Sequence, residues 1–146
     1  MKNTVLLFVL LFCFSCGLPA QKVIGEIVNG QAVLTIKEQV AKDNWEKLLK
    51  VHQNISVQFK TLKIIQQDEL YLLLGTSSTV NAIIVLREEN GQIYEARAGG
   101  GSRTVTCTGC TSGCTPTKDS GIGWICKFPC KECKKTETVT EDLILE

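Results

Sequence analysis

Two apolar stretches near the middle of the chain decide its fold: LYLLL at residues 70–74 and VNAIIVL at residues 80–86. Each stretch is shorter than an ordinary helix, and the second is rich in β-branched residues, which favour strands. We therefore expect both stretches to form central strands of a sheet.

Tight-turn signals lie on either side of these strands. Asn29-Gly30 separates apolar stretches at 23–28 and 31–36, and Asn90-Gly91 follows the stretch at 82–89. The Asn-Gly pair tolerates the two positive φ angles of a type I′ turn, which joins the strands of a two-residue hairpin. The sequence therefore predicts two β-hairpins.

One helix is expected between the first hairpin and the central strands. Apolar residues recur at helical spacing over 37–53, and an alternating pattern at 55–64 predicts a long strand. Together these elements predict an α+β fold in which one helix packs on an antiparallel meander sheet. We expect a single core between helix and sheet, containing Leu48, Phe59, Leu72 and Ile84.

The N-terminus has the pattern of a secretory signal peptide. Lys2 precedes an apolar run at 5–14, and small residues follow up to Ala20. The run is about half of the roughly 20 residues that a membrane-spanning helix needs, so we expect residues 1–20 to be removed and no transmembrane anchor to remain. The mature protein would then be periplasmic, cell-surface or secreted. Lipidation of Cys16 is the alternative, because Ser15-Cys16-Gly17 resembles the end of a lipoprotein box.

The mature chain is expected to carry no net charge. The sequence has 16 Lys and Arg against 15 Asp and Glu, and loss of Lys2 with the signal leaves 15 of each. This balance does not favour nucleic acid as a partner. The cysteine-rich region is nevertheless basic, whereas the charges of residues 136–146 are all acidic. This acidic tail either folds back on the basic region or leaves it free for a protein or an anionic surface ligand.

A glycine run predicts a boundary between two folded units. Glycines occupy positions 99–101, and three successive glycines resist regular structure. We expect an α+β domain at 21–98, a glycine-rich linker at 99–102 and a small, irregular, cysteine-rich β-hairpin module at 103–135. In the alternative, residues 103–106 continue the sheet after a glycine bulge.

The cysteines of the mature chain are spaced symmetrically. They are Cys107, Cys110, Cys114, Cys126, Cys130 and Cys133, with the same intervals read from either end. In an antiparallel hairpin of constant register, this spacing permits three nested disulfides, namely Cys107–Cys133, Cys110–Cys130 and Cys114–Cys126. Six cysteines allow many other pairings, and spacing alone does not choose among them. Because the region has few large apolar residues, we expect covalent links to hold it together.

Two other uses of the cysteines remain open. Cys107, Cys110, Cys130 and Cys133 form two C-x2-C pairs, the spacing by which zinc ribbons hold zinc through four thiolates. Export into an oxidising compartment and the two leftover cysteines favour disulfides instead. One C-x2-C pair would alternatively act as a redox dithiol, although neither pair has the βαβ context in which such chemistry is usual.

No catalytic residue stands out in the sequence. His52 is the single histidine, and no serine, cysteine or carboxylate lies at a diagnostic spacing from it. Trp124, in the cysteine-rich region, is the candidate contact residue. We therefore expect a small exported binding or structural protein that is disulfide-stabilised, has no cofactor and is not an enzyme. The alternative is an extracytoplasmic thiol-disulfide or zinc-binding protein that uses the C-x2-C pairs.

Overall fold

The computed structural model describes residues 22–98, 100–109, 113–127 and 132–140 of the 146-residue chain. The expected signal peptide, Cys16, Cys110 and Cys130 lie outside the described residues. The described part is mostly β and contains one helix, α2 (Glu38–Gln53). Its strands, in chain order, are β1 (Val23–Val28), β2 (Gln31–Leu34), β3 (Thr61–Gln67), β4 (Leu70–Thr76), β5 (Val80–Glu89), β6 (Gln92–Glu95), β7 (Arg97–Ala98), β8 (Gly101–Thr108), β9 (Thr115–Asp119), β10 (Gly123–Lys127) and β11 (Lys134–Thr140).

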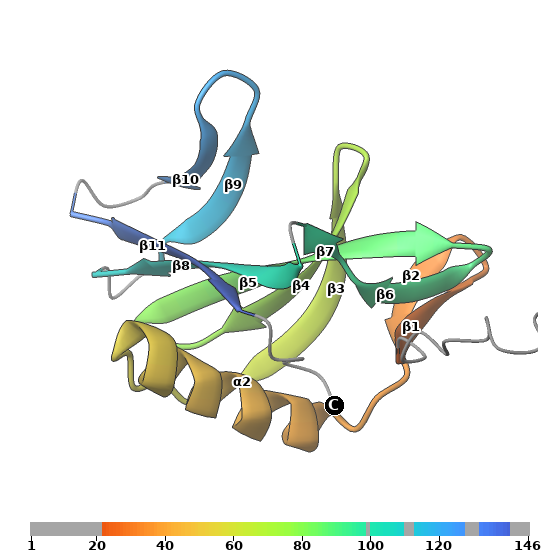
Figure 1. Cartoon of the computed structure of the whole chain (residues 1–146), viewed down its shortest axis with the longest axis horizontal. Coiled ribbons are helices and arrows are strands. Elements are labelled where there is room, and N and C mark those ends of the chain that lie inside the picture. The colour runs from red at the N-terminus through yellow and green to blue at the C-terminus, as the bar shows by residue number, and fades with distance from the viewer. Residues whose placement is uncertain (1–21, 99, 110–112, 128–131, 141–146) are drawn as a thin grey trace, which may run out of the picture.

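The long strand β5 organises a nine-stranded antiparallel sheet (Figure 1). β4 pairs along one edge of β5, whereas the other edge is shared between β8 at its first half and β6 at its second half. β6 leads on to β1 and β2, β8 leads on to β11, and β3 pairs with β4. Because β2 also lies beside β3, the sheet is nearly closed and barrel-like, with α2 along its lower side in the figure.

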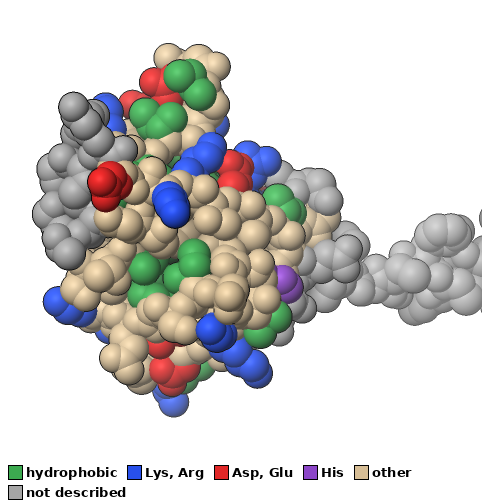
Figure 2. Space-filling model, turned by 90° about the vertical axis from the view of Figure 1, so that its left-hand side faces the viewer, with side chains coloured by type: hydrophobic (Ala, Val, Ile, Leu, Met, Phe, Trp, Pro, Cys, Tyr) green, Lys and Arg blue, Asp and Glu red, His purple; other side chains and the backbone are tan. Residues whose placement is uncertain are grey.

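The remaining strands, β9 and β10, form a separate two-stranded sheet. This hairpin protrudes from the body of the protein (Figure 1). The space-filling view shows hydrophobic and acidic side chains together at the protruding end (Figure 2).

The expected fold class is wrong: the structure is not a helix on a meander sheet with an added hairpin module. β8, placed by the sequence in that module, lies inside the large sheet between β5 and β11. Thr104 and Thr106 of β8 are buried. Because threonine is polar, the apolar pattern of the sequence did not identify this segment as a buried sheet strand. β11 pairs with β8 from Lys134 to Thr140, so residues 136–140 of the expected acidic tail also lie in the large sheet.

Gly101 and Ser102, which the sequence placed in a linker at 99–102, lie in strand β8, and Gly99 is outside the described residues. β8 begins at Gly101, which is buried. A Cβ atom at this position would lie 2.7 Å from both the Thr140 carbonyl oxygen and the Val139 Cγ1 atom. Any larger residue would therefore collide with β11, so the close approach of β11 requires glycine at this position. The alternative expectation, that residues 103–106 continue the sheet, agrees with this pairing.

The two hairpins and the helix are confirmed. Asn29 and Gly30 have φ angles of 52° and 78°, and Asn90 and Gly91 have φ angles of 54° and 80°, as a type I′ turn requires. The long strand expected at 55–64 differs, because β3 begins only at Thr61. The apolar side chains just before it, Ile55, Val57 and Phe59, pack on the helix side of the sheet.

Two apolar cores lie on opposite faces of the sheet. The inner core lies between α2 and the sheet and includes Trp45, whose ring centroid is 4.8 Å from that of Phe59. The outer core lies under the β9–β10 hairpin and consists of Leu72, Leu74, Ile83, Val105 and Trp124. Of the four residues expected in one core, Leu48, Phe59 and Ile84 belong to the inner core, but Leu72 belongs to the outer core. Successive side chains of a strand point to opposite faces, and Leu73 takes the inner position.

Candidate functional site

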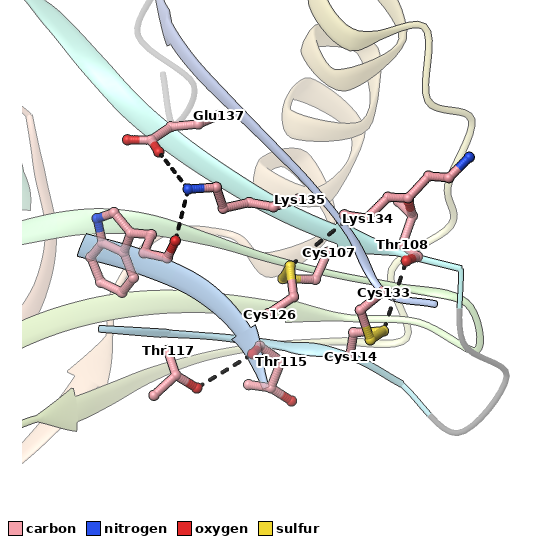
Figure 3. The surroundings of a disulfide bond; sticks show 11 residues. Cys107, Thr108, Cys114, Thr115, Thr117, Cys126, Cys133, Lys134, Lys135 and Glu137 are labelled. Atoms are coloured by element: carbon pink, nitrogen blue, oxygen red, sulfur yellow. Dashed lines mark hydrogen bonds and ion pairs between the residues drawn. A yellow bond between two sulfur atoms is a disulfide. The ribbon is translucent and has the colours of Figure 1, made fainter. Parts of the chain in front are cut away.

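Two disulfides tie the β9–β10 hairpin to the large sheet (Figure 3). Cys107 in β8 is bonded to Cys126 in β10, with Cα atoms 5.7 Å apart. Cys114, which precedes β9, is bonded to Cys133, which precedes β11, with Cα atoms 6.0 Å apart. Both separations are ordinary for disulfides. The protein is therefore disulfide-stabilised, a property typical of proteins in oxidising compartments.

The nested disulfide pairing is wrong for these four cysteines. Strand register places Lys135 opposite Cys107 and Pro116 opposite Cys126, a shift of two residues from the mirror-symmetric arrangement. The bond from Cys107 to Cys126 moreover joins two different sheets and does not cross a single hairpin. The third expected pair, Cys110–Cys130, lies outside the described residues.

The same two disulfides involve cysteines that the zinc interpretation needs as free thiolates. Of its four ligands, Cys107 and Cys133 belong to two different disulfides, and Cys110 and Cys130 are outside the described residues. Within the four described ranges of the chain, no group of three or more His, Cys, Asp and Glu side chains is arranged to hold a metal ion. A four-thiolate site would require both of these disulfides to be reduced first.

Trp124 anchors the hairpin through packing. The residue is 3% exposed and belongs to the outer core. The Lys118 Nζ atom lies 5.3 Å from the centroid of the indole ring. Lys135 Nζ donates a hydrogen bond of 2.8 Å to the Trp124 carbonyl oxygen. Burial of the indole thus adds a noncovalent attachment to the covalent ones.

A pocket opens where the hairpin meets the outer face of the sheet. It has a volume of about 190 Å³. Its lining combines four apolar side chains with two cationic ones: Leu70, Val85, Ala96, Trp124, Arg103 and Lys118. Because Lys118 and Trp124 belong to the hairpin and the other four to the body of the protein, the pocket exists only while the hairpin is docked.

Positive charge dominates the surroundings of this pocket. Arg103 Nη1 lies 3.3 Å from Glu137 Oε1. Lys135 Nζ lies 3.6 Å from Oε2 of the same carboxylate (Figure 3). One carboxylate therefore serves two cations. The Lys118 ammonium makes no ion pair with the described residues and faces the indole of Trp124. This arrangement favours an anionic group near the rim of the pocket.

Asp119 shapes the tip of the hairpin. Its Oδ1 accepts hydrogen bonds from the backbone N–H groups of Gly121, at 2.9 Å, and Ile122, at 3.0 Å. These two bonds stabilise the carboxylate and hold the pKa of Asp119 below its usual range. Ile122 itself is 79% exposed, so the tip presents an apolar side chain on a hydrogen-bonded turn.

A second, larger groove of about 630 Å³ lies between residues 56–60 and 77–79. Hydroxyl groups contribute much of its lining, but the Ser77 hydroxyl is already engaged in the turn. It accepts a hydrogen bond from the Val80 N–H at 2.9 Å and donates one to the Val80 carbonyl oxygen at 2.8 Å. The pocket beside Trp124 combines apolar walls with converging charges, so we take it as the candidate site.

Sequence reasoning missed most of this pocket. It singled out Trp124 and counted Arg103 and Lys118 only as part of a basic region. Leu70 and Ala96 belong to the part of the chain that was expected to form another domain. The clustering of basic residues around the cysteines was the one sequence signal that pointed toward the site.

Comparisons with known protein families, with curated proteins and with solved structures find no match for this chain. Among the described residues, no helix is both long and apolar enough to cross a membrane. The fold and the site define a small, mostly β, disulfide-stabilised protein with a cationic pocket under an anchored hairpin.

Proposed function

We propose that the protein is a small exported binding protein and that its binding site is the pocket beside Trp124. One observation carries this proposal: apolar walls and two cations converge on a concave site that is assembled from two sheets. Small-molecule sites characteristically combine a mainly apolar lining with a few placed polar groups.

The attachment of the hairpin supports a binding role. Two disulfides and the buried indole of Trp124 hold the hairpin against the outer face of the sheet. Little conformational entropy then needs to be lost when a ligand enters, because the walls are already in position. The signal-like N-terminus and the disulfides both support export.

The proposal is tested by NMR titration of the mature, oxidised protein with one-ring compounds that include an acid, a neutral amide and an amine. We expect at least one compound to shift the methyl signals of Leu70 and Val85 saturably. The variant Ala96→Phe, which fills the pocket, should abolish this response. Val33→Phe adds the same ring at an exposed position of β2 and should leave it unchanged.

The proposed function is wrong if none of the compounds shifts the pocket methyls. It is equally wrong if a response survives Ala96→Phe, since the compound would then bind elsewhere.

A further inference from the structure

We propose that the pocket selects an apolar group that carries a carboxylate a few atoms away. This inference rests on the proposed binding function and assigns it a ligand class. Three properties of the pocket lead to it: its size, the distribution of its charges and the kinds of donor that it offers.

The volume limits the apolar part of the ligand. A cavity of 150 Å³ lined by aliphatic and aromatic side chains accommodates benzene in an engineered protein. The present pocket, at about 190 Å³, is slightly larger and has apolar walls from Leu70, Val85, Ala96 and Trp124. It therefore accommodates one aromatic ring or a short branched aliphatic group, with the remainder of the ligand outside.

The charges select the polar part of the ligand. Arg103 and Lys118 line the pocket from two different sheets, and none of the described lining residues is acidic. Glu137 lies next to Arg103 but is shared with Lys135, so the surroundings keep an excess of positive charge. An amine would be repelled here, whereas an anion would gain charge-assisted hydrogen bonds.

The backbone around the pocket favours a carboxylate over a phosphate. The guanidinium of Arg103 is a planar fork with five N–H donors, and its ion pair with Glu137 joins one nitrogen to one oxygen. Such a fork pairs with carboxylates and phosphates alike, so the backbone of the lining residues makes the distinction. The lining residues are strand residues and one residue between strands, so the pocket does not offer the helix N-terminus that commonly holds phosphate.

This chemistry has two sources: a free aromatic or branched acid, and the C-terminus of a polypeptide that ends in an apolar residue. The titration therefore uses phenylacetate with phenylacetamide, and an N-acetylated dipeptide ending in phenylalanine with its C-terminal amide. In both pairs we expect the acid to bind at least about tenfold more tightly than the amide, because hydrogen bonds to charged groups are the stronger ones. Whichever acid binds more tightly identifies the source.

Charge removal provides the second half of the test. Lys118→Gln should weaken binding of the acid about tenfold while leaving the amide nearly unaffected. Lys127→Gln is the matched control, since Lys127 is an exposed lysine of the same hairpin and does not line the pocket. The signals of Trp124 and Val105 report whether each variant keeps the hairpin docked.

Each outcome bears on one claim. Acid and amide binding equally well at the pocket would overturn the ligand class and leave the proposed function standing. Tighter binding of the amine would overturn it as well. If no compound moves the methyls of Leu70 and Val85, the binding function itself fails.

Discussion

Cys107 and Cys126 are covalently joined, with Cα atoms 5.7 Å apart, although they belong to strands of two different sheets. β8 is held by backbone hydrogen bonds to β5 and β11, whereas β10 pairs with β9. The disulfide therefore links a strand of the large sheet to a hairpin that has no backbone pairing with that sheet.

The variant Cys107→Ser/Cys126→Ser should lose about 3 kcal/mol of unfolding free energy, the chain-entropy value for a bridge across 19 residues. Urea denaturation measures this loss. The Cys114–Cys133 disulfide closes a loop of the same length, so Cys114→Ser/Cys133→Ser is the matched comparison, with a similar expected loss. Unchanged stability in both variants would contradict the assigned pairing. A separate thiol and metal analysis of the exported protein addresses the zinc alternative, which four reactive thiols and bound zinc would favour.

Mild reduction should release the β9–β10 hairpin without releasing β8. β8 keeps its hydrogen bonds to β5 and β11 when the disulfides are broken. The hairpin keeps the packing of the outer core and the hydrogen bond from Lys135 to the Trp124 carbonyl oxygen, but it has no strand pairing with the large sheet. Hydrogen exchange before and after reduction should show lost protection in β9 and β10 and retained protection around Val105. Simultaneous loss of protection in β8 and the hairpin would show that the cysteine region unfolds as one module.

Trp124→Ala should destabilise the protein by about 3 to 5 kcal/mol, as removal of a buried aromatic side chain usually does. Ile122→Ala is the control on the same hairpin and should change stability by less than about 0.5 kcal/mol, because Ile122 is 79% exposed. Thermal or urea unfolding distinguishes the two variants. Equal effects would mean that the indole is not packed on the sheet.

The two cores can be separated by double-mutant cycles. Leu72→Ala should cost about 2 to 5 kcal/mol by itself. Combined with Trp124→Ala, it should show a coupling energy of about 0.5 to 3 kcal/mol, because both residues belong to the outer core. Combined with Leu49→Ala in the inner core, its effect should be additive. If Leu72 instead coupled to Leu49 and not to Trp124, the assignment of Leu72 to the outer core would be wrong, and its side chain would lie on the helix side of the sheet.

The hairpin tip should respond to pH through Asp119. The folded-state pKa of this carboxyl is lowered from the ordinary value of about 3.9. Its contribution is therefore present above the unfolded-state pKa and is lost as pH falls through the folded-state pKa. NMR of the Asp119 carboxyl and of the Gly121 and Ile122 amides should show one shared titration below the ordinary value. Asp119→Asn removes that titration, and a normal or raised Asp119 pKa would disprove the assignment.

The local elements were predictable because their signals are contained in short stretches of sequence. Asn29-Gly30 and Asn90-Gly91 are suited to positive φ angles, and apolar spacing over 37–53 indicated α2. The apolar runs that became β4 and β5 also predicted central strands. Each of these features depends on neighbouring residues, and local propensity is sufficient to select it.

The position of β8 could be decided only by the tertiary structure. Its inner face presents Thr104 and Thr106, so apolar periodicity did not mark it as a sheet strand. The glycine at position 101 is explained by the approach of β11, a contact with a distant part of the chain. A local reading assigned the same glycines to a flexible linker, because it could not detect that contact.

By itself, the sequence determined the turns, the helix, the central strands and the presence of a cysteine-rich basic region. The tertiary structure alone decided which cysteines pair, because a shift of two residues in strand register places Lys135, and not Cys133, opposite Cys107. The pocket likewise exists only in the tertiary structure, because folding brings Leu70 and Ala96 next to Lys118 and Trp124. Contacts between distant residues depend on how strands are ordered and aligned in the sheets, and short-range propensities do not specify that order.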